Sequence, residues 1–299
     1  MKKLLIILLV LIMLSFNSKF AFGFVSYEEN GATSEAKVTS DESTDFDKDY
    51  KDYISILDEY GRAHESFITA KSFYLRTKTQ RAENEALQAG IKLLQVRDSV
   101  ILNYLKMIYA KLAETEGVGG EVVTKMKIQI DQETKWFEDH RSSLSTSKSL
   151  DDLLSDTREA EGRYKSTTGK LYYQILLGIS HAQTTDYTSR LSELMEKLEA
   201  KISVIKQEER QEYKFTDSKI VLLERWIDDS KVMIARSEEK RKEAFPYVFE
   251  MKTSQVTSYN QIYQTQLNNL VSSSQYMKDA LYKLLEVVSE IKTAEEIKN

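Results

Sequence analysis

Apolar side chains recur at alternating intervals of four and three residues along most of this chain, and this spacing constrains the fold more than any other feature. From Phe46 to Tyr74, and again from Leu87 to Leu112, it places the apolar residues on one face of an α-helix. The chain has one proline and 10 glycines among 299 residues, too few for the many turns of a sheet-rich protein. The sequence therefore predicts an all-α protein.

Short breaks divide the periodic pattern into separate helices. Gly117, Gly119 and Gly120 form the clearest break, because glycine readily ends one helix and precedes the next. Weaker breaks are expected near residues 77–82, 142–149, 181–189 and 214–217. Because short connections place successive helices antiparallel, we expect an elongated antiparallel helical bundle of six to seven long amphipathic helices, built from coiled-coil-like hairpins.

Several residues suit the ends of these helices. Thr77 and Gln80 are spaced as a capping box, which favours a hairpin at this point over one continuous, locally distorted helix. Ser149 is a candidate cap for a helix whose first turn holds acidic residues. Proline suits a first helical turn, so Pro246 predicts a long helix that covers residues 247–295.

The N-terminus has the pattern of a secretory signal peptide. Lys2 and Lys3 precede an apolar run over residues 4–16, which is shorter than the roughly 20 residues that span a bilayer. Ala21 and Gly23 are the small residues of a cleavage site, so residues 1–23 are expected to be removed. The alternative is an uncleaved N-terminus that tethers the protein to the membrane.

The remaining chain divides into two parts by composition. Residues 24–44 are acidic, have little apolar content and predict a flexible linker. Residues 45–296 carry the helical periodicity and predict a single bundle domain. The expected location is periplasmic or secreted, in a bacterial-type exported protein.

Charge and cysteine content exclude several classes of function. The formal charge of −5 becomes −8 when residues 1–23 and their three lysines are removed, whereas nucleic-acid binding needs concentrated positive charge. The absence of cysteine excludes disulfides, thiolate metal sites and cysteine catalysis. After signal cleavage we also expect no stable membrane anchor.

No pattern of residues predicts a catalytic, cofactor or metal site. Asp45, Asp47 and Asp49 resemble the start of a calcium loop, but the sixth residue is Tyr50 where glycine is needed. A di-iron site in a bundle needs Glu three residues before His. The residues that precede the three histidines by this interval are Gly61, Phe137 and Gly178. We therefore expect a protein that is not an enzyme.

Two groups of residues are candidates for a functional role. Asp98 interrupts an apolar row, and a hairpin that turns near residue 80 would place His64 opposite it. Such a pair would be a register device or a proton-sensitive switch, whereas the alternative places Asp98 in water at the edge of the row. Trp136, Phe137 and His140 favour a core or inter-helix contact, with an exposed aromatic patch for a partner as the alternative.

These observations support two hypotheses of function. The first is an exported, non-enzymatic helical-bundle protein that acts through protein–protein contacts, with a protein partner or by self-association, in a scaffold, adhesin-like, assembly or holding role. The second is an extracytoplasmic binding protein for a small or lipid-like apolar ligand enclosed by the bundle.

Overall fold

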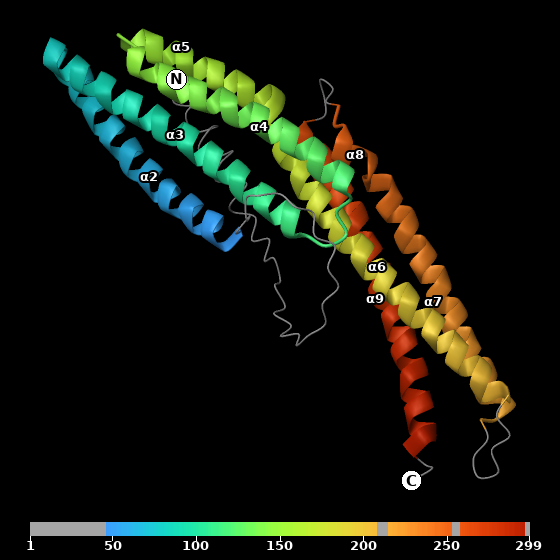
Figure 1. Cartoon of the computed structure of the whole chain (residues 1–299). Helices are drawn as coiled ribbons and strands as arrows, with labels where there is room; N and C mark the ends of the chain where they lie inside the picture. The colour runs from blue at the N-terminus through green and yellow to red at the C-terminus, as the bar shows by residue number, and fades with distance from the viewer. Residues whose placement is uncertain (1–45, 208–214, 253–257, 297–299) are drawn as a thin grey trace. The chain divides into compact units, whose positions relative to one another are not determined.

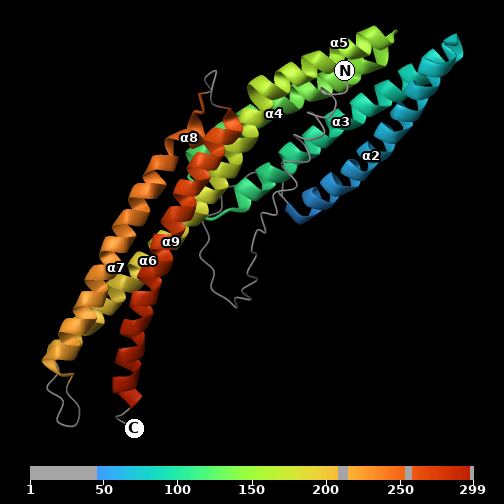
Figure 2. The ribbon, with the colours of Figure 1, turned by 180° about the vertical axis from the view of Figure 1, so that it is seen from behind.

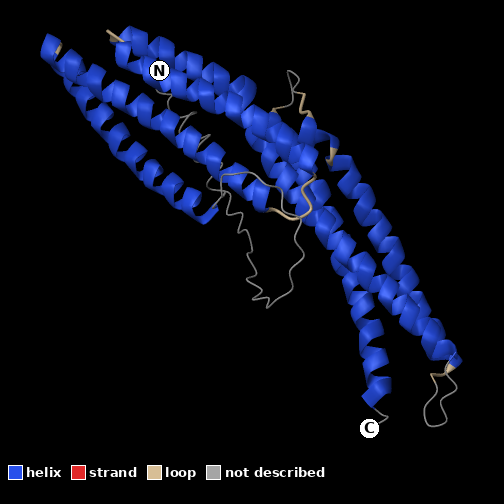
Figure 3. Ribbon diagram, viewed as in Figure 1, coloured by secondary structure: helices blue, strands red, loops and turns tan. Residues whose placement is uncertain are grey.

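The computed structural model describes residues 46–207, 215–252 and 258–296. These ranges consist of helices and short connections, with no β-strand among them (Figure 3). The prediction of an all-α helical bundle is therefore confirmed for the described part of the chain. The expected signal peptide at residues 1–23 and the expected linker at 24–44 lie outside the described residues.

The first two described helices form an antiparallel hairpin. Helix α2 (Phe46–Thr77) and helix α3 (Gln80–Glu114) lie side by side (Figure 1). Each turns one row of its apolar pattern toward the other, so that the rings of Tyr53 and Tyr104 lie 5.4 Å apart between their centroids. The hairpin, and not one continuous helix, is the observed arrangement.

The turn of this hairpin is built by Lys78 and Thr79. Lys78 has a positive φ of 53°, and the Thr79 side chain accepts a hydrogen bond from the Ala82 amide at 3.3 Å. The expected cap Thr77 is instead the last residue of α2, and its hydroxyl donates back to the Phe73 carbonyl at 3.0 Å. The prediction of a break was confirmed, but the prediction of its capping residue was wrong.

The glycine-rich break connects α3 to helix α4 (Gly120–Ser143), as expected. Gly117 has a φ of 80°, which few other residues adopt, and Gly119 is the N-cap of α4. A Cβ on Gly117 would also lie 2.9 Å from the carbonyl oxygen of Ala182. This glycine therefore provides both the turn and the close approach of two backbones.

The chain then runs through a long helical segment that contains one irregular turn. After a 3-10 turn at Leu144–Thr146, helix α5 (Leu150–Arg163) is capped by Ser149, which accepts a hydrogen bond from the Asp152 amide as predicted. A π-helical turn at Tyr164–Thr168 leads directly into helix α6 (Gly169–Gln207).

Helix α6 is continuous where the sequence indicated a weak break at residues 181–189. The hydroxyls of Thr184, Thr185 and Thr188 donate to the carbonyls four residues earlier, at 2.7 Å, 2.9 Å and 2.8 Å. These hydroxyls therefore have hydrogen-bond partners within the helix and do not interrupt it.

The last helices depart from the prediction of one helix over residues 247–295. Helix α7 (Asp217–Ala244) is followed by the four-residue helix α8 (Pro246–Phe249), and helix α9 (Tyr259–Glu296) begins later. Pro246 does start a helix, but Glu250 is extended, with φ −144° and ψ 115°. The expected long helix is therefore wrong, because the chain must reverse for α9 to return along α7 (Figures 1 and 2).

Contacts with α6 fix α8 at this reversal. Gln174 is buried, and its side-chain amide donates to the Val248 carbonyl at 3.2 Å. A Cβ on Gly178 would lie 3.5 Å from a methyl group of Val248, so the two helices approach closely at this glycine.

Helix α6 takes part in both of the large apolar cores. Its first half packs with α2, α3, α4, α8 and α9 around residues that include Leu105, Met126 and Ile175. Its second half packs with α7 and α9 around Leu198, Ile227 and Leu284. A smaller cluster joins α3 to α5 through Leu94 and Leu153.

Candidate functional site

Asp98 is fully buried on the face of α3 that packs against α4, and its partner is His140. The expected partner His64 does not meet it. Because Tyr53 lies opposite Tyr104 in the hairpin, His64 falls roughly opposite residue 93, about 7 Å along the helix from Asp98. Asp98 also faces away from α2, so both the expected pair and the alternative of an aspartate in water are wrong.

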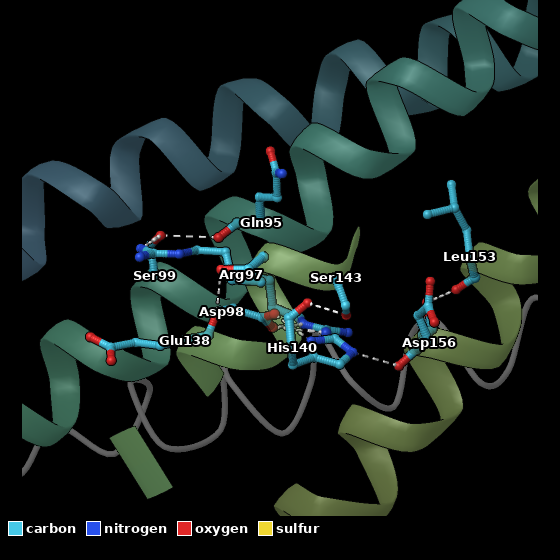
Figure 4. A network of polar contacts seen from close by, with 12 residues as sticks. Gln95, Arg97, Asp98, Ser99, Glu138, His140, Ser143, Leu153 and Asp156 are labelled. Carbon is cyan, nitrogen blue, oxygen red and sulfur yellow. Dashed lines mark hydrogen bonds and ion pairs between the residues drawn. The ribbon is translucent and has the colours of Figure 1, made fainter. Parts of the chain in front are cut away.

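Three hydrogen bonds enclose the Asp98 carboxylate (Figure 4). Nδ1 of His140 lies 2.5 Å from Oδ2 of Asp98. Nε and Nη2 of Arg97 donate to Oδ1 at 3.1 Å and 2.9 Å. All three side chains are more than nine-tenths buried, so one carboxylate lies between two cationic groups inside the protein.

The geometry around His140 favours the charged imidazolium form. Its Nδ1 faces the Asp98 carboxylate, and its Nε2 lies 3.2 Å from the carbonyl oxygen of Asp156 in α5. A carboxylate and a carbonyl oxygen are both acceptors, so both contacts are hydrogen bonds when both ring nitrogens carry hydrogen. The protonated side chain of His140 therefore connects α4 to both α3 and α5.

The pKa of His140 is raised above its ordinary value for the same reason. Burial lowers this pKa, but the hydrogen bond that His140 donates to Asp98 and the negative charge of Asp98 raise it by more. The positive charge of Arg97 lowers it, and the contact with the Asp156 carbonyl raises it. The net effect favours the proton in the folded state.

The aromatic residues beside His140 belong to the same inter-helix contact. Phe137 is fully buried, and the Trp136 ring stacks on the His140 ring with centroids 5.0 Å apart and planes inclined by 11°. The guanidinium of Arg163 lies over the Trp136 ring, 5.5 Å from its centroid. The structure places this group between helices, and not on the surface as a patch for a partner.

A second buried carboxylate lies on α4 and was not singled out from the sequence. Glu133 is 1% exposed, forms an ion pair with Arg163, and accepts a hydrogen bond from the Thr168 hydroxyl at 2.7 Å. It ties α4 to the end of α5 and to the π-helical turn. The spacing of Met126, Ile130, Glu133, Phe137 and His140 is 4, 3, 4 and 3, so this row marks both polar residues as core positions.

The buried network suits a structural and proton-binding role. The Nε2 of His140 is occupied by a backbone carbonyl and its Nδ1 by Asp98, so neither nitrogen is free to reach a substrate. Across the described ranges, no group of three His, Cys, Asp or Glu residues is placed to hold a metal ion. Among the same residues, no helix is long and apolar enough to cross a membrane.

His64 instead belongs to a second row of α2, which we call the outer row. The row that faces α3 includes the buried residues Asp49, Tyr53 and Ala63. The outer row is displaced from it by one residue and keeps the spacing of four and three. Its members are Tyr50, Ile54, Leu57, Gly61, His64, Ile68, Lys71 and Leu75.

The outer row leaves large apolar side chains in contact with solvent. Tyr50 is 48% exposed, Leu75 is 54% exposed, and Ile54 and Ile68 are each 38% exposed. A Cβ added to Gly61, near the middle of the row, would meet no atom within 4 Å. Packing within the chain therefore does not account for this glycine.

Comparisons with known proteins found no similarity. No family model, no curated protein and no solved structure matches the chain. Function therefore has to be argued from the residues and their arrangement alone.

Proposed function

We propose that this chain is an exported, non-enzymatic helical-bundle protein that acts through protein–protein contacts, and that the outer row of α2 is the contact surface. The observation that carries the proposal is the second apolar row with the spacing of a coiled-coil seam. On α2 one such row packs on α3, and the other leaves Tyr50, Ile54, Ile68 and Leu75 exposed. A helix with two seams is suited to contact two helices at once.

The occupant that fits this row best is a second copy of α2 in the antiparallel direction. With a twofold axis between residues 62 and 63, each member of the row meets a chemically suitable residue of the other copy. Gly61 faces His64, so the imidazole enters a gap that lacks a side chain. The other facing pairs are Tyr50 with Leu75, Ile54 with Lys71, and Leu57 with Ile68.

Gly61 gives this arrangement its main support. A glycine inside a helix costs about 0.5–1 kcal/mol relative to alanine. Inside the chain nothing occupies the space beside it, and His64, one turn away, is half-buried. Seating each His64 against the Gly61 of the other copy uses the gap as a hole for a knob.

The distribution of charge favours the antiparallel direction. Residues 46–61 contain five acidic and two basic residues, whereas residues 62–77 contain three basic and one acidic. An antiparallel pair brings the acidic half of one helix beside the basic half of the other. Asp58 and Glu65 approach each other across the axis, but Arg62 lies within one turn of both and offsets their repulsion.

Disulfide trapping tests both the contact and its direction, because the natural chain has no cysteine. Chains with Ile54→Cys and Lys71→Cys are purified separately, mixed and oxidised. The antiparallel register predicts mixed dimers, since a homodimer of the Ile54→Cys chain would need to join sulfurs on residues about 25 Å apart along the pair. Homodimers of each variant without mixed dimers would instead indicate a parallel pair and contradict the proposal.

Sedimentation of the unmodified protein supplies the second measurement. A concentration-dependent dimer is expected, and the double change Ile54→Glu and Ile68→Glu should shift it to monomer. Val221→Glu is the matched control, because Val221 is 62% exposed but lies on α7. A wild-type protein that stays monomeric at all concentrations would overturn the assignment of the second copy.

A further inference from the structure

An open pocket of about 560 Å³ lies where the hairpin of α2 and α3 meets the end of α4. Helix α2 contributes Ile56 and Glu59, α3 contributes side chains between Lys92 and Ser99, and Arg141 comes from the last turn of α4. Pockets of this volume accommodate small organic molecules. Ile56 and Glu59 are not members of the outer row, so the pocket is separate from the contact surface proposed for α2.

Arg141 is half-buried at this pocket and has only a neutral partner. Its Nη1 donates to the Ser99 hydroxyl at 3.1 Å, and no carboxylate of the described residues forms an ion pair with it. The Ser99 hydroxyl in turn donates to the Gln95 carbonyl at 3.0 Å, so its lone pair holds the guanidinium in place (Figure 4). A guanidinium has five N–H donors, and most of those of Arg141 are therefore free to contact a ligand.

Two further donor side chains line the same pocket. The side-chain amide of Gln95 forms no hydrogen bond within the described part of the chain, so its two N–H groups are free to donate. The Lys92 ammonium lies 2.5 Å from a carboxylate oxygen of Glu59, but both side chains are exposed, so this pair is weak and can rearrange. Ile56 and Val96 add apolar surface beside these donors.

The groups behind the pocket carry an excess of positive charge. Arg97 and protonated His140 share the single carboxylate of Asp98. Arg141 follows His140 in the sequence and adds a charge that has no ion pair among the described residues. Arg141 and the buried network together contain three cationic groups and one carboxylate, so a dianion bound beside Arg141 would balance their charges.

We propose that this pocket binds the phosphoryl group of a small phosphate monoester, with Arg141 and Gln95 as donors. The planar guanidinium forms paired hydrogen bonds with phosphate oxygens. A phosphate monoester carries close to two negative charges at neutral pH, which matches the excess of two positive charges. A phosphoryl group alone fills only part of the pocket, so the organic part of the ligand lies against Ile56 and Val96.

Isothermal titration calorimetry of the whole protein tests this site with glucose 6-phosphate as the probe, at neutral pH and low ionic strength. Glucose 6-phosphate should bind at one site per chain, inorganic phosphate should bind more weakly, and glucose should not bind. Arg141→Gln should weaken the binding of glucose 6-phosphate at least tenfold. Arg158→Gln is the matched control and should bind as the wild type does, because Arg158 is exposed on α5 and does not line the pocket.

A second variant separates loss of binding from loss of folding. Gln95→Glu keeps the size of the side chain and places a negative charge in the pocket, so it should repel the dianion and also weaken binding at least tenfold. Its urea midpoint should stay close to that of the wild type, since Gln95 makes no side-chain hydrogen bond within the described residues. The proposal is overturned if the wild type shows no saturable binding of glucose 6-phosphate, if either variant binds it as the wild type does, or if glucose binds equally well.

Discussion

Replacing Asp98 by leucine is the most direct test of the buried network. In the wild type, two hydrogen bonds from Arg97 and one from His140 reach the Asp98 carboxylate. Each such bond with a charged group contributes about 1.5–3 kcal/mol, which gives a gross contribution of about 5–9 kcal/mol for the three. In Asp98→Leu, His140 can release its proton, but the charge of Arg97 stays buried without a partner. We therefore expect the free energy of unfolding to fall by about 3–5 kcal/mol.

The pH dependence provides a second readout with a definite sign. The folded-state pKa of His140 is raised above its unfolded value of about 6.5. Its contribution to the free energy of unfolding is therefore complete below that unfolded pKa and is lost as the pH rises through the folded pKa. Within that window the wild-type stability should fall by up to about 1.4 kcal/mol per pH unit relative to His140→Gln.

Urea denaturation followed by circular dichroism at pH 6 and pH 9 measures both effects. His140→Gln should lower the free energy of unfolding more at pH 6 than at pH 9. In the Asp98→Leu background, most of this dependence on pH should disappear. Arg81→Gln is a control, because the Arg81–Glu85 pair is exposed and should contribute little. An unchanged midpoint in Asp98→Leu, or a cost of His140→Gln that is independent of pH, would refute the assignment of a structural proton.

Three further changes test other features of the fold. Gly90→Ala should lower the stability by about 1–3 kcal/mol, because its Cβ would lie 2.6 Å from Cδ1 of Leu153, whereas Gly162→Ala meets no atom within 4 Å and should not. Melting curves of the two variants measure this difference. Ser149→Ala should lose about 1 kcal/mol in the same assay, through its missing cap. The lowered pKa of His181 predicts that the stability of the wild type falls as the pH drops from 6.5 toward 4. Urea midpoints should show that the stability of His181→Phe falls less over the same range.

Features that depend on neighbouring residues in the sequence were predicted well. The spacing of four and three located α2, α3 and α4, because helical periodicity is a local property. Gly117 and Ser149 were identified for the same reason, since a positive φ and a cap are set by the residue itself. Pro246 starts a helix as expected, but the length of that helix depends on contacts of α8 with α6 that no local rule contains.

The π-helical turn shows how one residue changes a prediction. A spacing of four residues places Leu150 and Leu154 on the same face of a regular helix. In the structure Leu153 is 6% exposed and Leu154 is 45% exposed. The extra residue in the turn at 164–168 allows α5 and α6 to bury faces that are out of phase with each other.

The partner of Asp98 was missed because it depends on which helices pack together. Asp98 was recognised as a polar residue in an apolar row, but its partner was sought on the adjacent helix of the hairpin. The polar core positions of α4, Glu133 and His140, stand in a row of the same spacing. Matching polar core positions between all helices, rather than between neighbours only, would have identified His140 as a candidate partner.

The helices of this protein use two different polar devices to fix their pairing. Between α3, α4 and α5 the buried groups are charged, and one of them, His140, is an imidazole whose pKa Asp98 raises above its ordinary value. Between α7 and α9 the buried polar groups are hydroxyls, with Ser237 and Ser273 joined at 2.8 Å and Ser230 bonded to the Ala280 carbonyl at 3.3 Å. Serine hydroxyls stay neutral where an imidazole loses its proton, so a rise in pH through the pKa of His140 weakens the α3–α4–α5 contacts and leaves the α7–α9 contacts unchanged.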